Sequence, residues 1–188
     1  MRVRYLLFLM LLVVISSCTK DDDVIGTTAT LKADSAKRFV SVSSPASRLA
    51  LSGTLTFKIK DSTYTFNAAN DSVALVNVFL DNKKYYGLTA INKAHTMSFG
   101  ISSPGYAAAK ITDTIAGSQF LLNNAGQSGL EYTLSRSTAL PDMGKLIITQ
   151  YAQDSVLARG TFVTYLSNDG LSTSPFYKVT GSFNLKIK

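Results

Sequence analysis

Apolar and polar residues alternate along most of the chain, in the period of two that is typical of strands with one buried face. The clearest early example is Leu55, Phe57 and Ile59, each of which is followed by a Thr or a Lys. Asp61-Ser62 then interrupts the pattern with turn-forming residues, and the alternation resumes at Tyr64. This arrangement predicts a β-hairpin.

The same alternation returns at the C-terminal end, from Tyr177 to Ile187. Apolar side chains such as Val179 and Phe183 alternate there with Lys, Thr, Ser and Asn, which predicts a strand with one face towards the core. Gly181 falls on the apolar face of this strand. A glycine at such a position indicates either a bulge or a close approach of another group.

Seven further segments have strand patterns, and most are separated by turn residues. Two of them, 73–80 and 156–166, are apolar on both faces, as expected of central strands that are covered on both sides. Residues 106–115, with three consecutive alanines, are the one segment for which a helix is an alternative. Nine to ten short strands with close turns predict an all-β fold over residues 49–188, either an antiparallel β-sandwich or a small β-barrel. The seven segments are 73–80, 84–91, 96–101, 120–122, 130–135, 145–151 and 156–166.

The N-terminal residues 1–17 have a different pattern, with Arg2 and Arg4 preceding an apolar run from Tyr5 to Ile15. As a helix this run would be about 16 Å long, roughly half of the hydrocarbon core of a bilayer. Such a length suits the core of a signal peptide and not a transmembrane helix. We therefore expect residues 1–17 to be a signal peptide.

The apolar run ends in Ile15-Ser16-Ser17-Cys18, and Cys18 is the single cysteine of the chain. This stretch resembles the bacterial lipobox, in which an aliphatic residue and two small residues precede a cysteine. The resemblance implies that Ile15, Ser16 and Ser17 form the recognition site of the lipoprotein signal peptidase. It also implies that Cys18 carries the lipid that anchors the protein in the membrane. The alternative is that Cys18 is a buried free cysteine in an uncleaved anchor.

An acidic cluster follows the lipobox directly, in Thr19-Lys20-Asp21-Asp22-Asp23. It resembles the surface-export signal of bacteroidete lipoproteins, in which Lys20, Asp21, Asp22 and Asp23 would be read by the export machinery. The resemblance implies a place in the outer membrane, facing the cell exterior. The alternative is a solvated spacer that keeps the chain away from anionic headgroups.

Residues 18–48 would then form the lipidated N-terminus and a flexible tether, because they are rich in Thr, Ser, Ala, Asp and Lys. A coil of this length has an end-to-end distance of roughly 30 Å, enough to lift a small domain away from the lipid. Leu31, Phe39 and Val40 are exceptions to the polar composition and indicate that part of the tether contacts the domain.

The formal net charge is +7, which is compatible with the binding of polyanions. The lysines are scattered, however, and no run of five basic residues occurs, so the sequence does not predict nucleic-acid binding. Once Cys18 is acylated, no cysteine is left for a disulfide or for a thiolate metal site.

The candidate chemistry is sparse, so we expect neither a cofactor nor a metal site and no catalytic residues. His95 is the only histidine, and a catalytic triad would have to combine it with a serine and with Asp81 or Asp113. The carboxylates fall mostly in predicted turns, where an aspartate hydrogen-bonds its own backbone. An aromatic platform that includes Tyr85 and Tyr86 is the candidate ligand-binding surface.

Four patterns in the domain resemble a family of small bacteroidete lipoproteins known only as a domain of unknown function. They are Leu55–Ile59 with Thr63–Phe66, Gly144–Thr149, Arg159–Phe162 and Val179–Leu185. The resemblance implies a lipoprotein fold and no particular activity. Taken together, the N-terminal signals, the all-β domain and the sparse candidate chemistry predict a non-catalytic binding or accessory module of the outer membrane. Its ligand would be a glycan or an envelope protein. The alternatives are an envelope hydrolase and a purely structural component of the envelope.

Overall fold

The computed structural model describes residues 47–123 and 129–187, and within these ranges the chain is all-β. Each strand pairing in them is antiparallel, which confirms the fold class that the alternating pattern predicts. The strands of the described residues are β1 (Arg48–Leu49), β2 (Ser52–Ile59), β3 (Ser62–Asn67), β4 (Ser72–Leu80), β5 (Lys83–Ile91), β6 (Met97–Pro104), β7 (Ile111–Thr114), β8 (Gly117–Leu122), β9 (Leu130–Leu134), β10 (Gly144–Gln153), β11 (Val156–Ser167) and β12 (Tyr177–Lys186).

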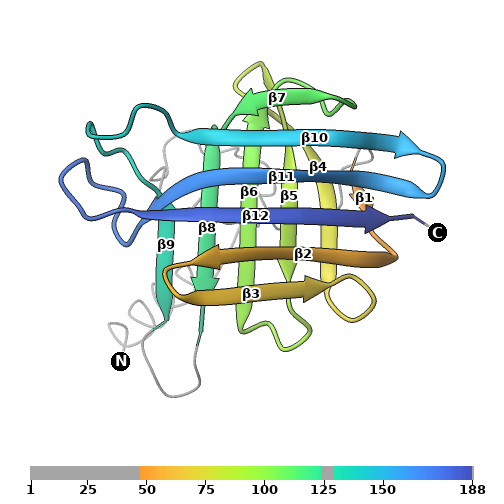
Figure 1. Cartoon of the computed structure of the whole chain (residues 1–188), viewed down its shortest axis with the longest axis horizontal. Helices are drawn as coiled ribbons and strands as arrows, with labels where there is room; N and C mark the ends of the chain where they lie inside the picture. Colours follow the sequence, from red (N-terminus) through yellow and green to blue (C-terminus); the bar gives the residue numbers. More distant parts are fainter. Residues whose placement is uncertain (1–46, 124–128, 188) are drawn as a thin grey trace, which may run out of the picture. The chain divides into compact units, whose positions relative to one another are not determined.

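The strands form one continuous sheet that curls into a half-barrel of two layers (Figure 1). Its path is β1-β4-β5-β6-β8-β9-β11-β12-β2-β3, and β10 and β7 extend it sideways from β11. In Figure 1 the strands β2, β3, β10, β11 and β12 run across the view in front. Strands β4, β5, β6, β8 and β9 run almost at right angles behind them. The fold therefore combines the crossed layers of an orthogonal sandwich with the continuous pairing of a barrel.

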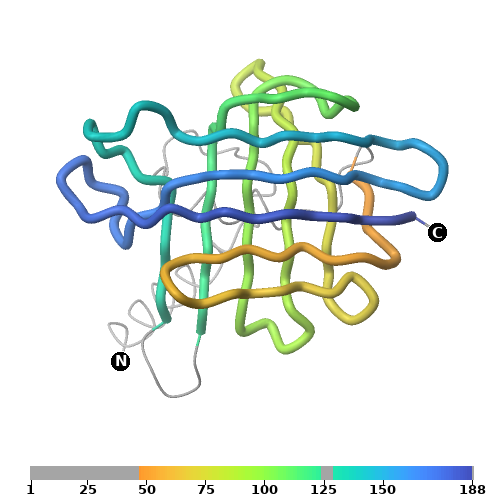
Figure 2. Tube along the Cα trace, viewed as in Figure 1, coloured from red at the N-terminus to blue at the C-terminus, as the bar shows by residue number. Residues whose placement is uncertain are grey.

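Two corners join the layers. At the first, the long strand β11 pairs at its end with β9 through Leu166 and Leu134. At the second, two consecutive residues bond to different layers: Ala50 N donates to Val73 O of β4, and Leu51 N donates to Lys186 O of β12, both at 2.8 Å. The tube in Figure 2 shows the result, with the orange start of the described chain beside its blue end.

The inner faces of both layers pack into one apolar core. The predicted apolar positions of β2 are buried in it, as are Val179, Phe183 and Leu185 of β12, whereas Tyr177 and Ile187 are partly buried. Phe57 lies at the centre of a cluster of aromatic rings, with its centroid 4.4 Å from that of Phe99 and 5.0 Å from that of Phe120. Phe99 stacks in turn on Phe162 of β11, at 5.3 Å. This chain of rings connects the two layers and adds favourable ring–ring interactions to the burial of apolar area.

Strands β11 and β12 each place a phenylalanine opposite a glycine of the other strand. Phe162 is directly opposite Gly181, and Phe183 is directly opposite Gly160. A Cβ added to Gly181 would lie 2.3 Å from Cζ of Phe162, and a Cβ added to Gly160 would lie 2.7 Å from Cζ of Phe183. The glycine on the apolar face of β12 therefore marks a close approach, since the pairing continues through it without a bulge.

The structure excludes the helical alternative for residues 106–115, because their second half forms strand β7. This strand pairs with β10, between Ile111 and Ile148 at one end and Thr114 and Lys145 at the other. Ile111 also packs against the core. Pairing and burial outweigh the helix propensity of the alanines, which is a weak preference.

Candidate functional site

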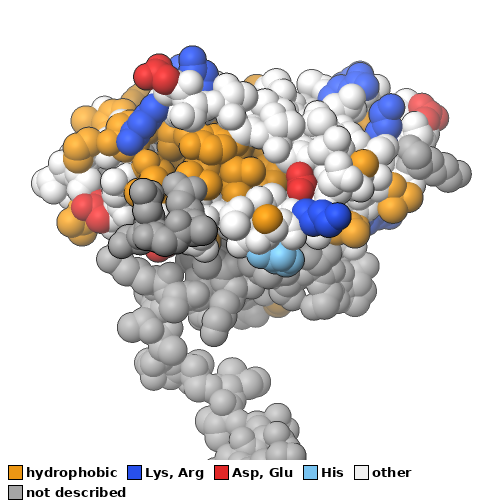
Figure 3. All heavy atoms as spheres, turned by 90° about the horizontal axis from the view of Figure 1, so that it is seen from below, with side chains coloured by type: hydrophobic (Ala, Val, Ile, Leu, Met, Phe, Trp, Pro, Cys, Tyr) orange, Lys and Arg blue, Asp and Glu red, His pale blue; other side chains and the backbone are white. Residues whose placement is uncertain are grey.

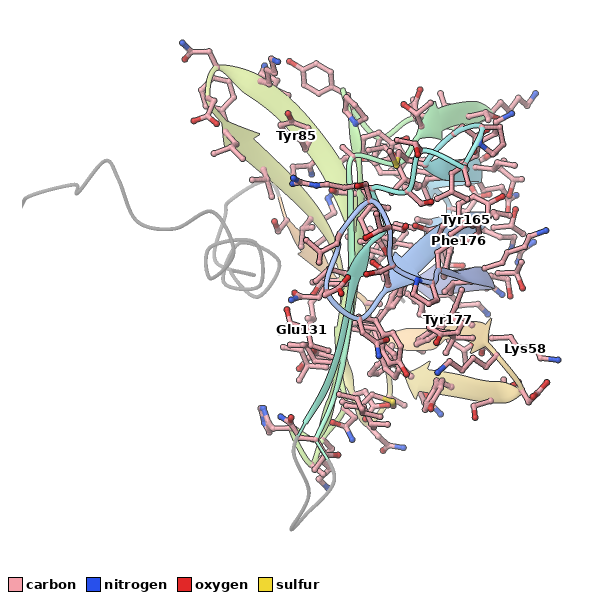
Figure 4. All side chains as sticks on the ribbon, turned by 90° about the vertical axis from the view of Figure 1, so that its left-hand side faces the viewer. Lys58, Tyr85, Glu131, Tyr165, Phe176 and Tyr177 are labelled. Atoms are coloured by element: carbon pink, nitrogen blue, oxygen red, sulfur yellow. The ribbon has the colours of Figure 1, made fainter. Side chains whose placement is uncertain are left out.

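The end of hairpin β4–β5 extends beyond its neighbouring strands (Figure 4, upper left). Strand β6 pairs with β5 only as far as Tyr85, and β1 pairs with β4 only as far as Leu75. The hairpin closes at Asp81-Asn82, whose φ angles of 48° and 58° are those of a type I′ turn. The residues next to this turn therefore belong to a two-stranded ribbon whose two faces are accessible from outside the core.

Phe79, Lys84 and Tyr106 gather on one side of this ribbon, and we call them the Phe79 patch. Phe79 and Lys84 are directly opposite each other in the ladder. The Lys84 ammonium lies 4.5 Å from the centroid of the Tyr106 ring and donates a hydrogen bond to the Tyr106 hydroxyl. Phe79 and Tyr106 are each 65% exposed, the largest exposed fractions among the large hydrophobic residues of the described chain.

The Phe79 patch combines two features of a recognition surface. Aromatic rings that project into solvent offer a large apolar area at a low cost in side-chain entropy. The Lys84 ammonium adds a hydrogen-bond donor and a positive charge, and its cation–π contact with Tyr106 stabilises its position by about 0.5–1 kcal/mol at an exposed site. Such a patch can stack on a sugar ring or on an aromatic side chain while it binds an acidic or hydroxyl group.

Tyr85 and Tyr86, the predicted platform, lie on opposite faces of β5. Tyr85 is half-buried on the outer face, opposite Val78, whereas Tyr86 is completely buried on the inner face. The Tyr86 hydroxyl donates a 2.7 Å hydrogen bond to Oδ2 of Asp113. Burial raises the pKa of Tyr86 above its ordinary value, and the hydrogen bond to Asp113 raises it further. The two rings therefore do not form one surface, and of the pair only Tyr85 is on the outside of the hairpin.

The Asp113 end of the core contains further polar groups on its inner face. Ser118 and Thr164 point into the interior from β8 and β11, and both are buried. Neither hydroxyl has a hydrogen-bond partner among the described residues. Buried hydroxyls without partners reduce stability, because their lost hydration is not replaced.

A second Lys–Tyr cluster is centred on the β2–β3 turn. Lys60 Nζ lies 4.0 Å from the centroid of the Tyr177 ring and 3.3 Å from the Tyr132 hydroxyl, to which it donates a hydrogen bond. This hydrogen bond raises the pKa of Lys60. Tyr132 is largely buried and its ring stacks on Phe120, so this cluster is continuous with the core. Its rings are therefore committed to packing, unlike those of the Phe79 patch.

His95 lies at the surface of a turn, where it is the pale-blue side chain in Figure 3. Its φ of 55° is in the left-handed region, and the Asn92 side chain closes the turn by accepting hydrogen bonds from the backbone N of Thr96 and Met97. In Figure 3 His95 lies below the large apolar area of this face and not within it.

Two of the carboxylates bond to the backbone of their own turns, as turn chemistry predicts, and one of them also reaches a distant turn. Asp71 accepts hydrogen bonds from Asn67 N and Lys93 N, and Asp142 accepts one from Gly144 N. Within residues 47–123 and 129–187 no group of three or more His, Cys, Asp or Glu side chains could hold a metal ion.

The predicted N-terminal sites lie outside the described residues. They comprise the peptidase recognition site Ile15, Ser16 and Ser17, the lipid attachment site Cys18, and the export signal Lys20, Asp21, Asp22 and Asp23. In the part of the chain that the structure does describe, no helix is long and apolar enough to cross a bilayer.

Sequence reasoning did not single out Phe79 or Lys84 as site residues. The apolar run 73–80 predicts a strand covered on both sides, which describes Val73–Val76 but not Phe79. The missed signal is the Asp81-Asn82 turn, which places Phe79 close to the end of a hairpin. Nothing in the sequence indicates the contact of Tyr106 with Lys84.

Comparisons of the chain with models of protein families, with curated proteins and with solved structures found no significant match. The resemblance to a family of small lipoproteins therefore stays a prediction from the residues quoted above.

Proposed function

We propose that the chain is a lipid-anchored protein of the outer membrane, facing the cell exterior, and that its β domain is a non-catalytic binding or accessory module. The ligand is a glycan or an envelope protein, and the Phe79 patch makes the contact. The observation that carries this proposal is the exposure of Phe79 and Tyr106, which both neighbour Lys84 at a hairpin end that extends beyond the neighbouring strands.

The chemistry of the Phe79 patch supports a binding role. Exposed aromatic side chains are enriched at recognition surfaces. Phe79 contributes little to the core because more than half of its surface is exposed. Its place beside Lys84 and near Tyr106 therefore suits contact with a ligand better than packing within the domain.

The N-terminal residues support the location. The basic and apolar leader, the Ile15-Ser16-Ser17-Cys18 stretch and the acidic cluster at Asp21–Asp23 follow one another in the order that an exported lipoprotein requires. Two or three acyl chains give stable anchoring, whereas a single chain gives only marginal binding.

The test of the binding role uses the lipidated protein in detergent, on an array of neutral and acidic glycans and in a pull-down from solubilised envelopes. We expect the double variant Phe79→Ala, Tyr106→Ala to lose binding at least tenfold, while the control Phe176→Ala retains it. Phe176 is a suitable control because it is also exposed but stacks edge-on against Tyr165. Equal binding by the double variant and the wild type, or retention of no ligand at all, would contradict the proposal.

The anchor has its own test. Metabolic labelling with an alkyne fatty acid should modify the wild type and leave Cys18→Ala unlabelled. Replacement of Asp21, Asp22 and Asp23 by alanine should protect the protein from protease added to intact cells. Labelling of Cys18→Ala would refute the lipid site, and persistent surface digestion of the triple variant would refute the export signal.

A further inference from the structure

Strands β4, β5, β6, β8 and β9 form the back layer of Figure 1. This layer has a second face, opposite to the core, whose central residues have mainly small side chains. We call it the back face. Register shows that its members point the same way, since Ala74 pairs with Thr89, Thr89 with Gly100, and Gly100 with Gln119. Its central residues are Ala74, Val76, Thr89, Gly100, Ser102 and Gln119.

The back face is buried, although the core cannot bury it. Ala74 and Val76 are each 1% exposed, and Thr89 is 4% exposed. Their chain neighbours, such as Leu75 and Leu88, already point into the core, so these side chains point away from it. No described strand lies against this side of the layer (Figure 4).

The outer face of the front layer provides the comparison. Thr161, Thr180 and Ser182 occupy equivalent outward positions on β11 and β12, and all three are exposed. An uncovered sheet face thus leaves even hydroxyl side chains accessible, whereas the apolar side chains of the back face are almost inaccessible. The low exposure of Ala74, Val76 and Thr89 is what a covered sheet face shows, and not what an open one shows.

We propose that this cover is the chain's own segment 31–46, docked across the back face. The described chain begins at the edge of this face: the Ser47 hydroxyl accepts a hydrogen bond from Asn77 N, and Leu49 pairs with Ala74. Leu49 is on the same side as Ala74, at the edge of the face, where it is 48% exposed. The residues that precede Ser47 thus start beside the face that needs a cover.

Length and composition fit this occupant. The segment 31–46 is mostly small and polar, but it contains Leu31, Phe39, Val40 and Val42. From Ser47 back to Phe39 an extended chain covers about 25 Å. Four strands at about 4.8 Å spacing span about 15 Å, so Phe39 and Val40 reach well across the face. The small residues of β4, β5 and β6 leave room for these larger side chains, as complementary packing requires.

Charge fits as well. Glu131 of β9 stands on this side of the layer (Figure 4), where it accepts a 2.9 Å hydrogen bond from Gln119 of the back face. Lys37 and Arg38 directly precede Phe39 in the docking segment. A basic pair next to the apolar anchor therefore meets an acidic group at the rim of the face.

The consequence is a shorter tether. Docking would leave only the residues from Cys18 to about residue 30 free between the lipid and the domain. It would also turn the back face towards the tether. This inference concerns a different surface from the Phe79 patch and does not depend on lipidation of Cys18.

The experiment measures thiol accessibility in the whole mature chain with Cys18→Ser, so that an added cysteine is the only thiol. Thr89→Cys reports on the back face, and Thr180→Cys on the exposed front face serves as the control. We expect a maleimide to react with Thr89→Cys at least tenfold more slowly than with Thr180→Cys. Adding Phe39→Asp and Val40→Asp should bring the two rates within about threefold, while Thr28→Asp, in the part of the tether outside the docking segment, should change neither rate.

Three results would overturn the proposal. The first is equal maleimide reaction rates of Thr89→Cys and Thr180→Cys when segment 31–46 is unchanged, and the second is a slow reaction of Thr89→Cys that survives Phe39→Asp with Val40→Asp. The third is a slow reaction that disappears on dilution, which would show that a second copy of the chain is the cover.

A second measurement avoids charged substitutions. Val40→Cys combined with Thr89→Cys should form a disulfide under mild oxidation, whereas Thr28→Cys with Thr89→Cys should not. Failure of the first pair to cross-link would also contradict docking.

Discussion

The reciprocal contacts between phenylalanine and glycine in β11 and β12 make Gly181 a sensitive position. In Gly181→Ala, the new Cβ would lie 2.3 Å from Cζ of Phe162 and 2.7 Å from the backbone oxygen of Thr56. Carbon atoms in good contact are about 3.5–4.0 Å apart, so the ring would have to move by more than an ångström. Phe162 is completely enclosed and stacks on Phe99, which leaves its ring little room to move.

Two effects of opposite sign set the size of the change. Overpacking of a dense core typically destabilises by about 1–3 kcal/mol. Replacing a strand glycine by alanine restricts the unfolded chain and returns about 0.5–1 kcal/mol. The φ of Gly181 is not in the left-handed region, so no backbone strain is added. We therefore expect Gly181→Ala to reduce the free energy of unfolding by about 1–2 kcal/mol.

Denaturant unfolding of the mature chain, followed by circular dichroism, measures this change. Ser182→Ala, at the next and solvent-exposed position of β12, is the matched control and should stay within about 0.5 kcal/mol of the wild type. In a Phe162→Leu background the Gly181→Ala change should be smaller, because the ring that it strikes is gone. Only part of the effect should disappear, since the contact with the Thr56 oxygen remains.

Two results would refute this reasoning. One is a Gly181→Ala protein as stable as the wild type. The other is an undiminished loss in the Phe162→Leu background, which would show that the two residues do not compete for the same space.

Three further substitutions test other parts of the structure. Tyr86→Phe should lower the free energy of unfolding by about 1–2 kcal/mol at pH 7, because the hydrogen bond to Asp113 is lost. Because the pKa of Tyr86 is raised, the wild type should lose stability as the pH rises above 10, the ordinary pKa of tyrosine. Tyr86→Phe should lose less stability over the same range. Denaturant titrations at pH 7 and above pH 10 measure both changes. Thr164→Val should raise the midpoint of denaturation, by about 1 kcal/mol in stability, because it removes a buried hydroxyl without a partner. Phe79→Ala should leave the melting temperature almost unchanged, because Phe79 is mostly exposed.

Each of these expectations has a contrary outcome. A Tyr86→Phe protein with the pH profile of the wild type would mean that Tyr86 ionises as easily in the folded as in the unfolded chain. A destabilised Thr164→Val protein would reveal a hydrogen bond or water at that hydroxyl. A large drop in melting temperature for Phe79→Ala would make Phe79 a structural residue and would weaken its assignment to a binding patch.

The alternating positions predicted the strands and the core well, because side-chain direction in a strand follows from local sequence. Leu55, Phe57 and Ile59 are all buried on one side of β2, and Val179 and Phe183 are buried on one side of β12. The closure of the sheet into a half-barrel could not be predicted from the alternating pattern. Which strands pair depends on contacts between distant segments, such as the bond from Leu51 N to Lys186 O that turns the chain from one layer to the other.

The candidate site was only partly predictable for the same reason. A tyrosine pair next to a turn suggests a platform, but the alternation of β5 places Tyr85 and Tyr86 on opposite faces. The exposure of Phe79 depends on where β1 and β6 end, and the contact between Lys84 and Tyr106 depends on a loop far along the chain. The N-terminal predictions, centred on Cys18, rest on residues that the structure does not describe.

The pairing of β2 with β12 constrains when the domain can mature. Val179 pairs with Ile59, and Lys186 pairs with Ser52. The first long strand of the described chain can therefore complete its pairing only after the last strand has been made. A chain that is still being synthesised lacks the strand that β2 needs. Until then the edge of β2 that pairs with β12 has unpaired backbone groups and is open to wrong pairings.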